Sequence, residues 1–309
     1  MNDTATQSRR SRIAELGYDY ASKPKRLREH CNLCGHGVFV TLSHRDRYGY
    51  PAQAQACRRC GLAFLNPVMT SEPYVEFYRN VYRPLVSAYH GRQIDATTIQ
   101  DEQREYGATL AAALDPHLAP LRGGRLLDVG GSTGVIAHHF QRAFDMQATV
   151  IDPAPMEVEV ARRLQLQTVT GFIESYDPGP TRFQLVLMCQ TVDHLLDIRS
   201  SLHKVREILS EDGIFFVDIV DFRAAYRRNG SVEEAVKIDH PYYLTEPTME
   251  AYLRRAGFAV RAIDYAADHL HVGFVCAKAE PDADAVPAPE VTRMAFHEIR
   301  DVHNRVPTV

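Results

Sequence analysis

The sequence predicts an α/β fold: a doubly wound, seven-stranded, mostly parallel sheet that follows a small N-terminal module built around four cysteines. Two observations lead to this prediction. Apolar strand-like runs alternate with amphipathic helical patterns over residues 119–279, as in a parallel sheet with helices on both faces. Two Cys-x-x-Cys-Gly pairs lie upstream, between residues 27 and 68.

The cysteine pairs predict a metal site. Cys31, Cys34, Cys57 and Cys60 form two knuckles separated by 22 residues, and each knuckle directs two thiolates at one centre. Disulfides and an iron–sulfur cluster are the alternatives. A chain without an apolar leader favours a reducing compartment, and the ribbon-like spacing favours zinc. Four cysteine ligands leave no open coordination position, so we expect one structural Zn²⁺ that supplies folding energy to a module with little core.

The chain has room for this module and one ordinary domain. We expect a weakly ordered N-terminus over 1–26, a zinc ribbon over 27–68, a helical connector over 69–118, the sheet domain over 119–279, and a linker with a short helix over 280–309. No apolar run approaches the roughly 18 residues of a membrane span, so we expect a cytoplasmic protein. The tyrosines that recur at helical spacing near Tyr74 and Tyr78 are interpreted as packing surface, with a polar substrate pocket as the alternative.

A glycine-rich turn follows the first strand of the sheet domain and leads into a helical pattern over 132–144. Such a turn brings backbone N–H groups close to a ligand. The next strand ends in an acid about twenty residues beyond the turn, where a ribose presents its hydroxyls. The unit predicts a nucleoside-bearing cofactor. Its contact residues are Asp128, Gly130, Gly131, Ser132, Gly134 and Asp152.

This turn resembles motif I of the class I S-adenosylmethionine-dependent methyltransferases, which usually reads Asp-x-Gly-x-Gly-x-Gly, with Ser132 at the middle glycine. The resemblance covers roughly residues 121–279 and implies S-adenosylmethionine as the cofactor. It further implies that Phe172 and Ile173 flank the adenine and that Gln190, after the fourth strand, belongs to the cofactor site. Two final strands, with the last one antiparallel, complete the expected sheet.

The connection after the fifth strand contains Asp239-His240-Pro-Tyr-Tyr243. It resembles the acid-His-x-x-Tyr stretch of zinc-ribbon-bearing deoxysugar C-methyltransferases, where the histidine and tyrosine face the sugar, although Asp239 replaces the usual glutamate. An imidazole has a suitable pKa to accept a proton as a methyl group arrives. His240 is therefore the predicted base, oriented by Asp239, and His194 is the next candidate. Either histidine could instead serve in packing alone.

Charge is distributed unevenly: residues 1–70 carry 11 Lys and Arg against 5 acids, although the whole chain has a net charge of −4. A basic module beside an acidic body favours a phosphorylated or otherwise anionic substrate. The leading prediction is methyl transfer to a small-molecule or saccharide acceptor, including a nucleotide sugar, in secondary metabolism or surface-polysaccharide synthesis. An RNA methyltransferase that reads RNA through its ribbon is one alternative, but no Asn/Asp-Pro-Pro-Tyr/Phe motif follows the fourth strand. A non-catalytic cofactor-binding module is the other.

Overall fold

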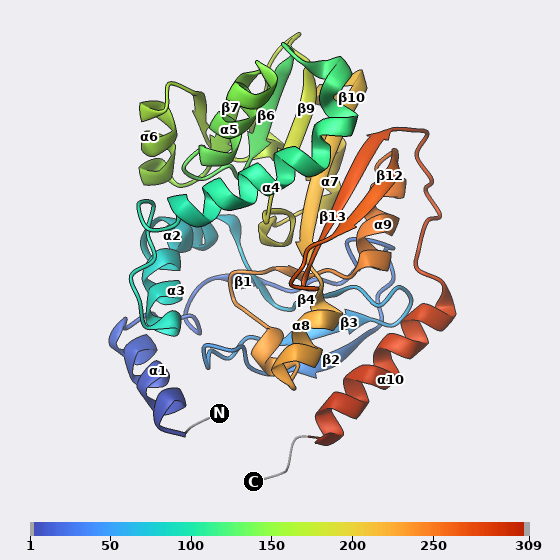
Figure 1. The fold of residues 1–309 in the computed structure, drawn as a ribbon. Coiled ribbons are helices and arrows are strands. Elements are labelled where there is room, and N and C mark those ends of the chain that lie inside the picture. The colour runs from blue at the N-terminus through green and yellow to red at the C-terminus, as the bar shows by residue number, and fades with distance from the viewer. Residues whose placement is uncertain (1–2, 306–309) are drawn as a thin grey trace.

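The computed structural model describes residues 3–305. A seven-stranded sheet, ordered β12-β13-β10-β9-β6-β7-β8, fills the upper half of the molecule in Figure 1. β6 to β10 pair in parallel and β13 pairs antiparallel with both of its neighbours. The predicted fold class is therefore confirmed. The strands are β6 Arg125–Val129, β7 Gln147–Asp152, β8 Gln167–Thr170, β9 Phe183–Met188, β10 Leu209–Val220, β12 Phe258–Tyr265 and β13 His271–Lys278.

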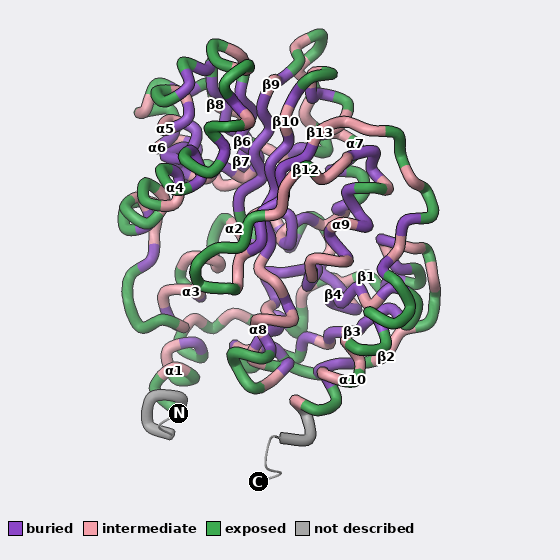
Figure 2. Tube along the Cα trace, turned by 45° about the vertical axis from the view of Figure 1, so that its right-hand side comes forward, coloured by how far each residue is buried: buried purple, intermediate pink, exposed green. Residues whose placement is uncertain are grey.

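Helices cover both faces of this sheet because its strands are apolar on both sides. In β6, Leu126 packs into the core under one set of helices and Leu127 into the core under the other. One face carries α4 (Gln100–Leu118), α5 (Val135–Phe144) and α6 (Pro155–Arg163), and the opposite face carries α7 (Ile198–Ile208) and α9 (Glu246–Arg255). Figure 2 shows the buried strands between exposed helical surfaces.

The cysteine module is continuous with the rest of the chain. Its strands β2 (Phe39–Ser43), β3 (Ala54–Cys57) and β4 (Ala63–Leu65) form a sheet ordered β11-β4-β3-β2. β11 (Tyr242–Tyr243) comes from the connection that follows β10, so the sheet crosses the boundary expected at residue 68. A second core, visible as the buried lower region in Figure 2, joins this module to α2 (Ser71–Asn80), α3 (Tyr82–His90) and α8 (Phe222–Asn229).

The N-terminal segment has more structure than the sequence suggested. Its described part forms α1 (Asp3–Glu15), which lies against α3, and β1 (Lys25–Arg26), which pairs with β5 (Val68–Met69). α1 is stabilised by burial, because its residue Ile13 packs into the second core. Residues 1 and 2 lie outside the described residues.

Two further features differ in detail from the sequence reading. The helix expected to start at Ser132 begins at Val135, because Ser132 and Gly134 have φ angles of 50° and 74° and belong to the turn. The C-terminal helix α10 spans Pro289–Arg305 and contacts α8. Within residues 3–305, no helix combines the length and apolar character that crossing a membrane requires.

Candidate active site

A cavity of about 840 Å³ lies at the carboxyl ends of β6, β7 and β9. This is the place in an open α/β sheet where the strand order reverses and ligands bind. Its walls come from both halves of the molecule: the strand ends form one end, and α2, α3 and the 192–197 turn form the other. We call these the cofactor end and the acceptor end.

The cofactor end is shaped by glycines that leave room for a ligand and for close packing. A Cβ on Gly130 would lie 2.4 Å from Thr191 Oγ1, and a Cβ on Gly134 would lie 2.6 Å from Leu166 Cδ1. Both glycines also have positive φ angles, so side chains are disfavoured there on backbone grounds as well. The turn therefore folds tightly against its neighbours and lines the cavity with Gly130, Gly131 and Ser132.

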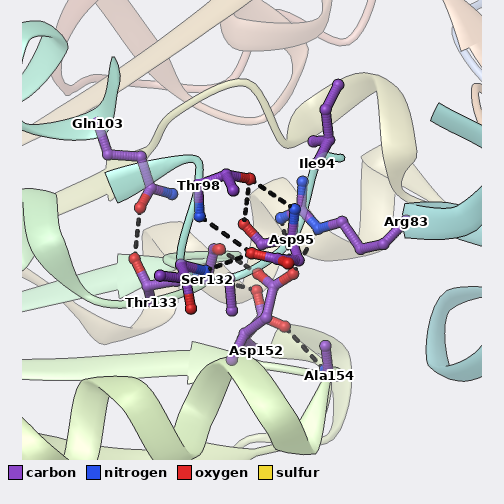
Figure 3. Close-up of polar contacts among 12 residues, drawn as sticks. Arg83, Ile94, Asp95, Thr98, Gln103, Ser132, Thr133, Asp152 and Ala154 are labelled. Carbon is purple, nitrogen blue, oxygen red and sulfur yellow. Dashed lines mark hydrogen bonds and ion pairs between the residues drawn. The ribbon is translucent and has the colours of Figure 1, made fainter. Parts of the chain in front are cut away.

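Two buried carboxylates stand beside this turn. Asp152 accepts hydrogen bonds from the backbone N–H of Ser132 at 2.9 Å and of Ala154 at 2.8 Å, as Figure 3 shows. Asp128 is fully buried, and among the described residues neither of its carboxylate oxygens has a hydrogen-bond partner. An unpaired buried carboxylate is costly unless a ligand donates to it. The hydroxyl and ammonium donors of S-adenosylmethionine fit this arrangement.

Burial governs the acidity of both groups. It raises the pKa of Asp128 to about 7, with a further contribution from the neighbouring Asp152. It also raises the pKa of Asp152 to about 7, with a further contribution from Glu157. Both acids therefore change charge near neutral pH in this structure.

The structure brings together every predicted cofactor residue except Gly134. Phe172 and Ile173 line the cavity, as does Gln190, whose backbone N–H donates to Asp218 Oδ1 at 2.5 Å. Gly134 lies behind the turn, where it permits close packing against α6. Asp218 also accepts a hydrogen bond from Tyr106 of α4 at 2.8 Å.

Sequence reasoning missed an ion pair at this end. Arg83 of α3 donates through Nε to Glu157 Oε1 of α6 at 2.7 Å, and Glu157 also accepts a hydrogen bond from the Ser132 hydroxyl. The pair joins the connector to the cofactor end. No local pattern could have shown it, since the two partners stand 74 residues apart.

The acceptor end is lined by tyrosines and one histidine. Tyr74, Tyr78 and Tyr82 project from α2 and α3, and His194 closes the short helix η3 (Val192–His194). The Tyr74 hydroxyl donates to the His194 carbonyl at 2.6 Å, and the Tyr78 hydroxyl is hydrogen-bonded to His194 Nδ1. The stripe interpreted as packing surface thus also lines the cavity, as the alternative interpretation held.

His240, the predicted base, lies behind His194 and outside the cavity wall. Its Nδ1 is 2.7 Å from Asp193 Oδ2, and its Nε2 is 3.4 Å from Asp239 Oδ2 and 3.3 Å from Lys237 Nζ. The His194 and His240 ring centroids are 4.3 Å apart. Of the histidines chosen from the sequence, only His194 reaches the cavity.

Tyr243 and Asp239 also lie behind the wall. The Tyr243 hydroxyl accepts from the Lys237 N–H at 3.1 Å and donates to the Lys237 carbonyl at 2.8 Å. Its ring packs against Phe222 with a centroid distance of 5.0 Å. Asp239 is almost fully buried, and its backbone carbonyl lies 3.0 Å from His194 Nδ1.

The charges of this cluster follow from burial and mutual contact. Burial lowers the pKa of His194 to about 4, and the neighbouring His240 acts in the same direction, so the His194 ring is neutral at pH 7. For Asp193 and Asp239, burial would raise the pKa, but the attraction of the neighbouring His240, His194 and Lys237 side chains outweighs it and holds both pKa values below the ordinary range. The Asp239 carbonyl can only accept, so its contact with His194 favours a proton on Nδ1, whereas the Tyr78 hydroxyl at the same nitrogen can either donate or accept. In the tautomer with the proton on Nδ1, Nε2 carries the lone pair.

The four cysteines converge as the spacing predicted. The Sγ atoms of Cys31 and Cys60 are 3.6 Å apart, and those of Cys34 and Cys57 are 3.5 Å apart. A tetrahedral shell with sulfur–metal distances of about 2.3 Å separates its sulfurs by about 3.8 Å, whereas a disulfide requires about 2.05 Å. All four thiols are free, and their donor set fits one tetrahedral metal ion.

The comparisons with known proteins agree with this fold. A family model described as "Methyltransferase domain" matches residues 99–263, which is more than half of the chain. The chain therefore belongs to this family of methyltransferase domains. The solved 1,6-didemethyltoxoflavin-N1-methyltransferase of Burkholderia thailandensis superposes with a TM-score of 0.50, at 20% identity, over 71% of this chain and 96% of that one. This likeness shows the class I methyltransferase fold.

Two curated relatives differ in how much they share with this chain. The ubiquinone biosynthesis O-methyltransferase of Methylocella silvestris is 31% identical over 31% of this chain, which spans 40% of that relative's length. The C-methyltransferase NovU of Streptomyces niveus is 26% identical over 87% of this chain, which spans 65% of its length. The second alignment runs through both the cysteine module and the sheet domain, whereas the first covers about a third of the chain.

Proposed function

We propose that the protein transfers a methyl group from S-adenosylmethionine to a small-molecule acceptor. The observation that carries this proposal is a single cavity with buried carboxylates at one end and a tyrosine–histidine cluster at the other. A hollow of this kind suits a small molecule, whereas an RNA enzyme would call for a broad basic surface. The buried carboxylates argue for retained cofactor binding, and transfer of a labelled methyl group distinguishes an enzyme from a non-catalytic cofactor-binding module.

At the cofactor end, Asp152 would hold the ribose hydroxyls, and Phe172 and Ile173 would flank the adenine. Asp128 would accept hydrogen bonds from the cofactor's remaining donors, and the glycine turn would admit it. The bound cofactor supplies an electrophilic methyl group on a sulfonium. The protein's own contribution is therefore mainly to position the acceptor and remove its proton.

We propose that His194 Nε2 accepts the proton of the acceptor. His194 is the cluster histidine that lines the cavity, and Nε2 carries the lone pair when Nδ1 is protonated. Asp193 and Asp239 are ionised and favour the imidazolium that forms, but burial and the neighbouring His240 outweigh them and hold the pKa of His194 at about 4. His194 is therefore a base only for an acceptor proton that becomes acidic as the methyl group arrives. His240 then acts behind His194, with its own ring tied to Asp193. The earlier choice of His240 as the base would require residues 237–243 to move, so variants of both histidines separate the two assignments.

Asp193, His194 and His240 also carry ligand atoms close enough for a metal ion. The Lys237 ammonium already lies 3.3 Å from His240 Nε2, and a second cation there would be repelled. We therefore propose proton chemistry for this cluster. Turnover that persists after chelation of loosely bound metal would support this, whereas restoration by an added divalent ion would reverse it.

We further propose a saccharide acceptor that carries phosphate, such as a nucleotide sugar, and methylation at carbon. Burial lowers the pKa of His90, which lines the cavity, and the cations Arg47, Arg92, Arg9 and Lys237 act in the same direction. Of these four cations, Arg92 also lines the cavity. Such a group favours an anion. Similarity to a C-methyltransferase across both the module and the sheet domain supports the choice of carbon.

For the module we propose one structural zinc ion bound by Cys31, Cys34, Cys57 and Cys60, in a chain that works in the reducing cytoplasm. Free thiols in the described chain and the sulfur spacing support this. Elemental analysis should find about one zinc per chain. Cys57→Ser should lower stability and expression before it changes the chemistry, and a metal-free protein of full stability would refute the site.

The central test uses the methyl-labelled cofactor. Calorimetry should detect S-adenosylmethionine binding, and labelled methyl should pass to a member of a panel of nucleotide sugars and unphosphorylated sugars, with S-adenosylhomocysteine as the second product. Binding without transfer to any sugar would remove the acceptor proposal and leave the cofactor site. Salt-sensitive transfer to RNA would favour the RNA alternative. Absence of cofactor binding would overturn the whole proposal.

A further inference from the structure

The cysteine module holds the segment that carries His240 from both sides. We call residues 236–243 the His240 segment. The Arg47 N–H donates to the Val236 carbonyl at 2.9 Å, and the Leu65 N–H donates to the Pro241 carbonyl at 3.0 Å. Pairing of β11 with β4 continues this attachment. The module therefore fixes a segment that lies almost two hundred residues away in the chain.

Asp46 stands at the centre of this contact and is 1% exposed. Its Oδ1 accepts hydrogen bonds from the N–H groups of Tyr48 at 3.1 Å and Tyr50 at 2.9 Å, which close the turn of the module. Its Oδ2 accepts a hydrogen bond from the Ile238 N–H at 3.0 Å. One oxygen thus shapes the module, and the other reaches the His240 segment two residues before His240.

A carboxylate in this position is expensive to bury. Burial raises the pKa of Asp46 to about 8, although its three backbone N–H donors act in the opposite direction. An apolar residue would avoid that cost but would leave the three buried donors without an acceptor. The arrangement therefore stabilises one particular placement of the His240 segment against the module.

We propose that Asp46 is a positioning residue that acts through His240: its bond to Ile238 sets the distance between the His240 and His194 rings and links the metal module to the acceptor end. The positioning role of Asp46 rests on its hydrogen bonds to the module and to Ile238, and the expected effect on turnover rests on the proposed function. Loss of this bond should loosen the His240 segment without changing the cofactor end.

The Asp46→Asn variant distinguishes the roles of the two carboxylate oxygens of Asp46. An asparagine can keep its oxygen toward Tyr48 and Tyr50, but its NH₂ group then opposes the Ile238 N–H, and only the link to the His240 segment is broken. Hydrogen exchange at residues 236–240 should accelerate about tenfold, as expected when one buried hydrogen bond is lost. Affinity for S-adenosylmethionine and the metal content of the full chain should remain at wild-type values.

Asp221→Asn is the matched control. Asp221 Oδ1 accepts from the Ala224 N–H at 2.8 Å and Oδ2 accepts from the Glu246 N–H at 3.2 Å, so the chemistry is the same at another point of the same connection. In Asp221→Asn, the rate of hydrogen exchange should change near residues 224 and 246 alone. Unchanged exchange at 236–240 in Asp46→Asn, or equal acceleration there in Asp221→Asn, would overturn the proposal. If Asp46→Asn does not fold, Asp46→Ser, which retains one acceptor, takes its place under the same criteria.

A kinetic arm distinguishes positioning from general destabilisation. With any acceptor that is turned over, Asp46→Asn should lower kcat and leave the KM for S-adenosylmethionine unchanged. In a double variant with His240→Asn the two losses should not add, because both act through one ring. Additive losses would refute the link to His240. The exchange arm needs no acceptor, so its outcome stands even if no methyl transfer is found.

Discussion

The two ends of the cavity are built in different ways. At the cofactor end, Asp128, Gly130 and Asp152 follow directly from the ends of neighbouring parallel strands, so their positions are set by a short, continuous part of the chain. At the acceptor end, the Tyr74 hydroxyl of the connector lies 3.0 Å from the carbonyl of Asp239, which is 165 residues away. The cofactor end therefore depends mainly on the sheet, with the Arg83–Glu157 pair as its link to the connector. The acceptor end depends on how the module, the connector and the 221–245 connection dock together.

This difference has a physical consequence. Strand ends in a packed sheet have few alternative placements, whereas contacts between distant segments require each segment to be ordered separately. Substitutions that destabilise the module should therefore affect the acceptor end before the cofactor end. Variants that affect only one end of the cavity test this separation directly.

The largest expected effect is on turnover at the acceptor end. His194→Asn removes the proposed base and should lower kcat by about 10²–10⁴-fold. His240→Asn should have the smaller effect of the two, because this ring lies behind the wall. Both should bind S-adenosylmethionine with wild-type affinity in calorimetry. A larger loss with His240→Asn than with His194→Asn would return the role of base to His240.

The second-largest expected effect is on the affinity of the cofactor end for S-adenosylmethionine. Asp152→Ala should remove a charge-assisted hydrogen bond of about 1.5–3 kcal/mol and weaken S-adenosylmethionine binding tenfold or more. Hydrogen exchange at residues 236–240 should stay at its wild-type rate, because the two ends are supported separately. Unchanged cofactor affinity would disprove the role of Asp152, and faster exchange at the distant segment would disprove the separation.

The same difference explains which parts of the structure the sequence could predict. Gly130, Asp152 and Gln190 lie at the ends of strands that are recognisable from apolar runs, so local pattern was sufficient. His240 was recognised as a candidate, but its place behind His194 depends on the docking of β11 onto β4, which no local pattern encodes. The Arg83–Glu157 ion pair was missed for the same reason. Segment 3–26 was also underestimated, because Ile13 gains its burial only from the distant second core.

A pH dependence should distinguish the ends further. Burial raises the pKa of Asp152 to about 7, and the bound cofactor's hydroxyls require the ionised form. Below this pKa, Asp152 of the free protein must lose its proton before the cofactor binds. The affinity for S-adenosylmethionine should therefore fall about tenfold from pH 8 to pH 6. Calorimetry across this range measures the effect. Asp152→Asn should bind more weakly at pH 8 and show a flatter profile, and an unaltered slope in that variant would assign the dependence to Asp128, whose pKa burial also raises to about 7.

The smallest expected effect lies outside both ends, at the contact between α10 and α8. Glu298 accepts from Arg223 Nε at 2.6 Å and from Arg227 at 2.7 Å, and its hydrogen bonds to Arg223 hold its pKa below the ordinary value. Such a group stabilises the folded chain above its unfolded pKa and loses that contribution as the pH falls through its lowered pKa. Because the arginines are largely exposed, solvent screening limits the contribution to about 1 kcal/mol or less. Glu298→Gln should therefore lower the free energy of unfolding slightly, and more at low salt than at high salt, in urea titrations. Cofactor affinity and exchange at residues 236–240 should not change, and a loss at either end would mean that α10 supports the cavity as well.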